Sequence, residues 1–345
     1  MKKKWIKYFL TSLLLILVLY ITFHKIYNKE SWNVVRETIK NIKCYYVFIC
    51  LLLSFLYFLC QGIYMKIILG TLNTKISVIK GIFYTVIEFF FSGITPSSTG
   101  GQPVQLYYMT VDKIPMRKSY ITLILNTVFF KLILAILGIL VLVFNNSFIM
   151  NTHYVYKVFF VIGFLVDLFI ITMGCLLLFN FNLIKSMYKA VYNFCKKLKL
   201  FKNKLDNKEP DEVLNRYKDE IKYIKTHKLA VFVTFIITFI QRLFLFSIIY
   251  IVYRALGLNN YSYFDLLAIQ VCVQLAMEAM PLPGGSGLSE GMLHNIFTMI
   301  FVAGLADVGM LLTRTFTFYI PLTISGIILL IDYIFRLKRK NKLVN

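Results

Sequence analysis

Long apolar runs separated by short polar segments dominate the sequence. A helix needs about 20 apolar residues to cross the hydrocarbon core of a bilayer, and six runs are long enough or nearly so. They comprise residues 5–23, 44–69, 119–144, 154–180, 229–253 and 309–334. Four shorter apolar pieces lie at 77–94, 103–112, 263–280 and 288–303. The pattern predicts an all-α, polytopic integral membrane protein with about six full spans.

Each pair of short apolar pieces flanks a break rich in glycine, proline and hydroxyl side chains. The first break is TPSSTGGQP at residues 95–103, and the second is PLPGGSGLSE at residues 281–290. Irregular backbone at membrane depth is tolerated only where it is buried in protein or lines a wet cavity. We therefore interpret the short pieces as two re-entrant helix hairpins, although 77–94 and 263–280 also fit ordinary short spans. Paired breaks of this kind are typical of transporters built as inverted repeats around a central site.

The basic residues orient the predicted helices. The formal net charge is +22 at pH 7, and the Lys and Arg residues lie between or beside the apolar runs. Basic loops tend to face the cytoplasm, which places both termini and the loops near Lys75 and Lys113 inside. Residues 145–153 and 304–308, which contain no Lys or Arg, then lie outside. On this map the first hairpin enters from the cytoplasm and the second from outside.

Two basic segments differ from ordinary short loops. Residues 24–43 would lie outside, against the charge rule, and their mixed Lys, Glu and Trp content predicts an interfacial amphipathic helix instead. Residues 181–228 hold thirteen Lys and Arg and six Asp and Glu, with apolar residues at helical spacing. This segment is too short and too charged to form a catalytic domain. We expect a basic cytoplasmic linker between the two halves that lies on anionic lipid headgroups.

Composition and motifs exclude several function classes. The six cysteines and four histidines show no metal-ligand spacing, so we expect no metal and no cofactor. Neither break matches the phosphate-binding loops of nucleotide enzymes, and no nucleophile–base set is present, so no catalytic residue is predicted. The positive charge fits contact with anionic lipid, and we expect no nucleic-acid binding. The oligomeric state does not follow from the sequence.

The second break predicts an anion site. Its prolines end the preceding helix, while its glycines permit positive φ and close backbone approach. These glycines are Gly284, Gly285 and Gly287. A helix that begins near Ser289 would present free N–H groups and the positive end of its dipole to a lipid phosphate or a substrate carboxylate. A tight turn between packed helices is the alternative, and Glu290 on the first turn either caps the helix or binds substrate.

The first break carries comparable chemistry. Thr99 and the neighbouring hydroxyls, together with the amide of Gln102, would line the central site. Gly100 and Gly101 supply flexibility, and Pro103 suits the first turn of a helix. We assign these four positions, from Thr99 to Gln102, to substrate binding.

Ionisable residues inside apolar runs are costly and usually functional. The candidates are Glu88, Lys131, Asp167, Arg242, Glu278, Glu290 and Arg314. Glu88 and Glu278 each lie shortly before a break, whereas Arg242 and Arg314 lie in mid-span and need a carboxylate, a carbonyl dipole or an anionic substrate. We add Glu88, Arg242, Glu278, Glu290 and Arg314 to the predicted substrate site.

Both breaks resemble the signature stretches of one family. Residues 95–109 (TPSSTGGQPVQLYYM) and 281–291 (PLPGGSGLSEG) resemble those of the lysylphosphatidylglycerol synthase transmembrane (flippase-like) family, and the order of apolar runs agrees over nearly the whole chain. The Gly-Gly-Gln-Pro form is similar to that of Gram-positive, low-GC bacteria. The resemblance implies a multi-pass protein of the bacterial plasma membrane that moves or handles polar lipids such as aminoacylated phosphatidylglycerol.

The resemblance also frames the alternatives. Full-length family members add a soluble aminoacyltransferase domain, whereas this sequence ends at Asn345, eleven residues after its last predicted span. We therefore expect polar lipid translocation, with a membrane phospholipid as substrate, rather than enzyme activity. One alternative is a phosphatidylglycerol lysyltransferase, or a subunit of one, in lipid modification and cationic peptide resistance. The other is a non-transporting scaffold for envelope assembly.

Overall fold

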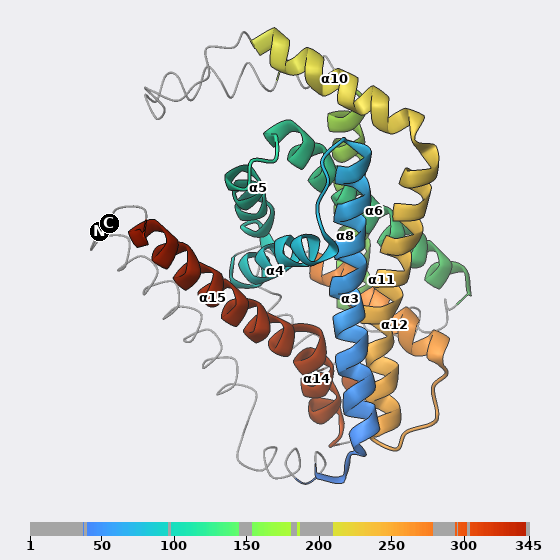
Figure 1. Ribbon diagram of the computed structural model, residues 1–345. Helices are drawn as coiled ribbons and strands as arrows, with labels where there is room; N and C mark the ends of the chain where they lie inside the picture. The colour runs from blue at the N-terminus through green and yellow to red at the C-terminus, as the bar shows by residue number, and fades with distance from the viewer. Residues whose placement is uncertain are drawn as a thin grey trace.

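The computed structural model describes residues 37, 40–95, 98–144, 154–180, 185–186, 210–278, 294, 296–301 and 304–342. Every regular element in these ranges is a helix (Figure 1), which confirms the all-α prediction. The predicted run 5–23, most of 24–43 and the whole second break lie outside the described residues. Five described segments are long and apolar enough to cross a membrane: Cys44–Thr71, Met116–Phe144, Lys157–Phe179, Lys228–Ala255 and Ala306–Arg336.

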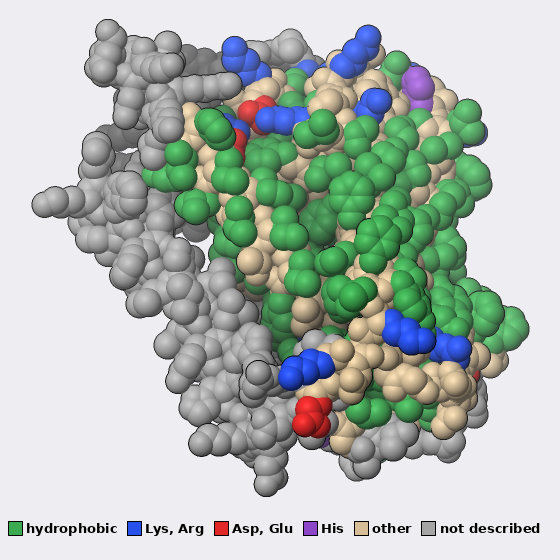
Figure 2. Space-filling model, turned by 60° about the horizontal axis from the view of Figure 1, so that its bottom comes forward, with side chains coloured by type: hydrophobic (Ala, Val, Ile, Leu, Met, Phe, Trp, Pro, Cys, Tyr) green, Lys and Arg blue, Asp and Glu red, His purple; other side chains and the backbone are tan. Residues whose placement is uncertain are grey.

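The long helices match the predicted runs closely. They are α3 (Cys44–Thr71), α6 (Met116–Phe144), α8 (Tyr154–Phe179) and α11 (Lys228–Ala255), followed by α14 (Ala306–Arg314), the π-helical segment η3 (Thr315–Tyr319) and α15 (Ile320–Lys342). The shorter helices are α4 (Val78–Ile94), α5 (Gly101–Val111), α10 (Pro210–Thr226) and α12 (Tyr263–Glu278). Figure 2 shows hydrophobic side chains covering the middle of one face, with Lys and Arg toward its two ends. This distribution is the one that a bilayer around the molecule requires.

Helices α4 and α5 form a hairpin that returns to the side from which it enters. The Ser77 side chain caps α4 by accepting a hydrogen bond from the Lys80 N–H at 3.2 Å. Near the start of α4, the Lys80 Nζ lies 2.6 Å from an Asp112 carboxylate oxygen, and the Tyr84 hydroxyl donates to the same carboxylate at 2.9 Å. Asp112 directly follows α5, so the two ends of the hairpin meet.

Helices α3 and α4 approach each other at two glycines. A Cβ on Gly81 would lie 2.5 Å from the Gly62 carbonyl oxygen, and a Cβ on Gly62 would lie 2.6 Å from the Ile82 side chain. Real Cβ atoms do not come this close, so backbone packs directly on backbone here. This contact fixes where α4 departs from α3.

The hairpin and α12 start from opposite ends of the helix pair α3–α11. These two long helices are antiparallel, because the Gln241 side chain donates to the Tyr57 carbonyl at 3.1 Å while Cys50, earlier in α3, packs with Val252, later in α11. The turn into α4 follows the C-terminal end of α3, and the loop into α12 follows the C-terminal end of α11. An inverted repeat predicts this opposed arrangement; a re-entrant second hairpin stays a prediction.

The last predicted span is not one uniform helix. Its run at 309–334 contains η3, a stretch of π-helix between α14 and α15. Pro321 follows closely and has no N–H to bond to the carbonyl of Thr317, which explains a local widening of the ladder. The Phe316 carbonyl accepts a hydrogen bond from the Ser54 hydroxyl of α3 at 2.6 Å.

Within the predicted linker 181–228, α10 packs on protein. Its residues Tyr217, Ile221 and Ile224 are buried in the same core cluster as residues of α3, α4 and α6. The Tyr217 hydroxyl donates to the Leu177 carbonyl of α8 at 2.9 Å, and the Glu220 carboxylate pairs with Arg117 of α6 at 2.6 Å. The apolar side of α10 is therefore buried against the ends of the helices in the bundle.

Candidate functional site

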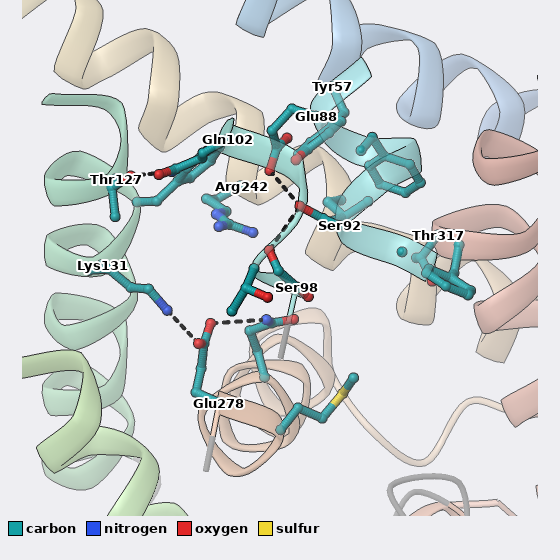
Figure 3. Close-up of a pocket in the computed structure, with 18 of the residues that line it drawn as sticks. Tyr57, Glu88, Ser92, Ser98, Gln102, Thr127, Lys131, Arg242, Glu278 and Thr317 are labelled. Carbon is teal, nitrogen blue, oxygen red and sulfur yellow. Dashed lines mark hydrogen bonds and ion pairs between the residues drawn. The ribbon is translucent and has the colours of Figure 1, made fainter. Parts of the chain in front are cut away.

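A central cavity of about 1010 Å³ lies among the helices. Every long described helix except α15 contributes to its wall, as do α4, α5, α12 and η3. Figure 3 shows its polar side chains projecting from several elements toward a common space. Its polar lining includes Tyr57, Tyr120, Gln270, Thr313 and Thr317, beside the residues described below.

The first break forms one wall of the cavity. Helix α4 ends at Thr95, which has extended backbone with φ −109° and ψ 147° because Pro96 follows it. The Thr95 hydroxyl accepts a hydrogen bond from the Gly100 N–H at 2.9 Å and donates to the Phe91 carbonyl at 2.6 Å. Ser98 then turns the chain with a positive φ of 54°. This local network sets the start of α5 beside the end of α4.

Gly100 and Gly101 allow the start of α5 to pack closely against the end of α4. A Cβ on Gly101 would lie 2.1 Å from the Ser92 hydroxyl and 2.5 Å from the Glu88 carbonyl oxygen. A Cβ on Gly100 would lie 2.5 Å from the Thr95 side chain. Gly100 has an ordinary φ of −80°, so its backbone does not need the conformational freedom of glycine; the assignment of both glycines to substrate binding stays a prediction.

Hydroxyl and amide groups order the wall on both sides of the break. The Ser92 hydroxyl lies 3.2 Å from both the Glu88 Oε1 and the Ser98 carbonyl. On α5, the Gln102 amide donates to the Thr127 hydroxyl of α6 at 2.5 Å. Glu88 is thus held on the cavity wall by Ser92, one helical turn later on the same helix.

Arg242 brings a positive charge from α11 into this space. Its guanidinium carbon lies 3.9 Å from the centre of the Phe130 ring, a stacked cation–π geometry. It forms no salt bridge within 4 Å, and its Nε is buried without a hydrogen-bond partner among the described residues. In the view of Figure 3 it projects into the space between Glu88 and Glu278. Within the described part of the chain, Arg242 is therefore a cation on the cavity wall that has no carboxylate in salt-bridge contact.

Lys131 and Glu278 form the opposite part of the wall. The Lys131 Nζ of α6 forms an ion pair with Glu278 of α12 and lies 3.1 Å from the Asp167 Oδ1 of α8. The Gln274 amide lies 3.5 Å from the other Glu278 oxygen. The Asp167 side chain is fully buried, whereas that of Glu278 is 22% exposed toward the cavity. One cation thus joins three helices through two carboxylates.

Six of the predicted site residues line this one cavity. They are Glu88, Thr99, Gln102, Arg242, Glu278 and Arg314. The Arg314 guanidinium lies 5.0 Å from the centre of the Phe318 ring, which also lines the cavity. Gly100 and Gly101 support the wall from behind, while Gly284, Gly285, Gly287 and Glu290 lie outside the described residues. The predicted anion site at the second break is therefore not placed.

Several residues that line the cavity were not predicted from the sequence. Ser92 and Gln274 each lie four positions from a predicted carboxylate, so helical spacing would have found both. Thr127, Thr313 and Thr317 carry no comparable signal, because single hydroxyls are common in apolar helices. No group of three or more His, Cys, Asp or Glu side chains is placed to hold a metal ion in the described part of the chain.

Comparison with known proteins assigns the family. The family model for the lysylphosphatidylglycerol synthase TM region matches residues 5–325. The chain belongs to this family. It is also 23% identical over 301 residues to a UPF0104 membrane protein of Archaeoglobus fulgidus, an alignment that covers 84% of this chain and 86% of that protein. No solved structure matches the chain significantly.

Proposed function

We propose that this protein translocates a polar lipid across the bacterial cytoplasmic membrane, with the headgroup passing through the central cavity. The observation that carries the proposal is Arg242, which presents a cation to a cavity of about 1010 Å³ and forms no salt bridge with a described residue. A charge at membrane depth is costly unless it is paired or serves a ligand. A phosphate group on the headgroup is the natural partner for its guanidinium.

The rest of the lining suits the other parts of such a lipid. Carboxylates at Glu88 and Glu278 would accept hydrogen bonds from hydroxyl or ammonium groups, and the hydroxyls of Ser92 and Thr127 would bind glycerol oxygens. Aromatic and aliphatic residues such as Phe89, Leu106 and Ile170 complete the wall, and they would accommodate the apolar part next to the headgroup. A cavity with both kinds of lining fits an amphiphile better than a free ion.

We also propose an orientation for the protein. Contacts gather Lys80, Asp112, Arg117, Glu220 and Arg336 at one end of the bundle, through the Lys80–Asp112, Arg336–Asp112 and Arg117–Glu220 pairs. Basic segments face the cytoplasm in most membrane proteins, so this end would be cytoplasmic and would include α10 and the C-terminal end of α15. Basic loops here would contact anionic lipid.

The proposal is tested by lipid scrambling in proteoliposomes. Purified protein is reconstituted with a trace of fluorescent phosphatidylglycerol, and the outer-leaflet label is removed chemically over time. Wild-type protein should move inner-leaflet label outward faster than protein-free vesicles do. Loss of a charge-assisted hydrogen bond costs roughly 1.5–3 kcal/mol, so Arg242→Gln should slow transport about tenfold or more. Arg254→Gln, at the end of the same helix and next to Asn259, is the matched control.

Two outcomes would replace this proposal. If wild type, Arg242→Gln and protein-free vesicles all exchange lipid at one rate, the protein is not a translocator, and a scaffold role gains support. If the purified chain transfers lysine from lysyl-tRNA to phosphatidylglycerol, the lysyltransferase alternative, which the family description favours, takes its place.

A further inference from the structure

The group formed by Lys131, Asp167 and Glu278 has more acids than bases. Its three side chains come from α6, α8 and α12, and Lys131 contacts both carboxylates. Asp167 is fully buried, and the Lys131 side chain is only 13% exposed. With every group ionised, the group carries one negative charge in excess. An excess charge is unfavourable at membrane depth, where water is scarce.

Arg242 is a further cation whose charge offsets this excess. It reaches the site from α11 and acts electrostatically on Asp167. It acts in the same way on Glu88, which faces the cavity from α4. Among the described residues of the helices packed against α12, the charged groups around Glu278 are Lys131 from α6, Asp167 from α8 and Arg242 from α11. The positive charge of Arg242 thus stabilises negative charge on carboxylates at two sides of the cavity.

We propose that Lys131, Asp167 and Glu278 form a proton-binding site, and that one proton enters it when an anionic headgroup binds Arg242. The inference rests on the proposed translocation and adds its coupling ion. A bound phosphate engages the charge of Arg242, so the excess negative charge of the group is no longer offset. A proton then restores the balance by converting one carboxylate into a neutral carboxylic acid.

Glu278 is the group that takes the proton. Its side chain lines the cavity and is 22% exposed, whereas Asp167 does not line the cavity and has no exposed surface. Water in the cavity delivers the proton to a Glu278 oxygen, and the proton returns to water when the headgroup leaves. No other bond forms or breaks. Lys131 keeps its pairing with Asp167 throughout, so this ion pair joins α6 and α8 in both states.

Thermodynamic linkage gives the direction in which the lipid affinity changes with pH. If anion binding increases the affinity of the group for a proton, then protonation increases the affinity for the anion by the same factor. Lipid affinity should therefore rise as the pH falls, and transport of an anionic lipid should respond to a pH gradient across the membrane. A cavity that binds its ligand through Arg242 alone would show neither effect.

Calorimetry on the full chain in detergent tests the inference. A soluble short-chain phosphatidylglycerol is titrated into the protein in two buffers of equal pH and different ionisation enthalpy, which reports protons taken up per lipid bound. Wild type should take up about one proton. Glu278→Gln and Asp167→Asn each remove the excess charge, so both should bind the lipid with proton uptake near zero. Glu220→Gln, in the distant pair with Arg117, should behave as wild type.

The outcomes separate this inference from the proposed function. Lipid binding without proton uptake, or equal uptake by Glu278→Gln, overturns the proton site and leaves translocation standing. Absence of lipid binding by wild type overturns both. In proteoliposomes, an imposed pH gradient should change the transport rate of wild type and leave that of Glu278→Gln unchanged. An equal response of the two proteins also refutes the proton site.

Discussion

At the scale of single residues, a few ionisable side chains in apolar helices define the cavity. Sequence reasoning found them because a charge inside an apolar run is conspicuous: Glu88, Arg242, Glu278 and Arg314 were all predicted and all line the cavity. Their partners could not be predicted. Lys131 and Asp167 lie 36 positions apart on different helices, and only packing brings them together.

The central position of Lys131 between two carboxylates predicts a strong effect on stability. Removing one partner of a buried ion pair costs about 3–5 kcal/mol, so Lys131→Met should lower the melting temperature markedly. Adding Asp167→Asn removes the carboxylate that is fully buried, and the double variant should recover a large part of the loss. Thermal unfolding followed by size-exclusion chromatography in detergent measures both. Simple additivity of the two losses would contradict this account of the group.

At the scale of elements, short turns and close backbone contacts position the cavity. Apolar length predicted the bounds of the described helices well, because the cost of unpaired backbone in lipid leaves few alternatives to a helix. The apolar piece 77–94 and the break that follows it also predicted where α4 ends, at Ile94. The π-helical turn at η3 was not predicted, since a uniform apolar run conceals a change of helical register.

Close packing at the start of α5 predicts a cost for any side chain there. Gly101→Ala would place a methyl group against the Ser92 hydroxyl and the Glu88 carbonyl, and overpacking typically costs about 1–3 kcal/mol. Gly70→Ala is the control, because nothing lies within 4 Å of the added Cβ. It should leave stability unchanged or raise it by up to about 1 kcal/mol. Equal melting temperatures of the two variants would show that the hairpin is looser than described.

The bond between Ser54 and the Phe316 carbonyl predicts a link between α3 and η3. Leaving a buried carbonyl without its partner costs about 1–3 kcal/mol, so Ser54→Ala should lower the stability by this amount. Thr323→Ala removes an exposed hydroxyl that bonds to a carbonyl of its own helical turn, at Tyr319, and should have little effect. If Ser54→Ala and Thr323→Ala have equal melting temperatures, the bond between Ser54 and Phe316 does not stabilise the contact between α3 and η3.

At the scale of the molecule, the apolar belt and the antiparallel long helices determine how it lies in a membrane. The charge pattern of the loops predicted which segments share a side, and the pairs Lys80–Asp112 and Arg117–Glu220 bring those segments together. The relation between the two halves was predicted less completely, because direct similarity between their sequences is slight. Only the opposed directions of α3–α4 and α11–α12 make that relation visible.

Opposite ends of the bundle should label from opposite sides of the membrane. Asn260 lies in the exposed loop after α11, and Lys75 lies in the exposed turn after α3. Each is replaced by cysteine in a cysteine-free background. An impermeant thiol reagent added to intact cells should label position 260, and position 75 only after permeabilisation. Lys222→Cys on α10 should follow position 75. Labelling of positions 75 and 260 from one side would refute the orientation.

The contact between Gly62 and Gly81 restricts how this sequence can change over evolutionary time. Elsewhere in a protein core, substitution by a larger side chain can be compensated when a facing residue is replaced by a smaller one. Here neither residue has a side chain to lose, and each added Cβ would meet backbone: the Gly62 carbonyl oxygen lies 2.5 Å from a Cβ on Gly81, and the Val78 carbonyl oxygen lies 2.8 Å from a Cβ on Gly62. Substitutions at these two positions therefore have no compensating partner, and related sequences that keep this crossing should keep both glycines.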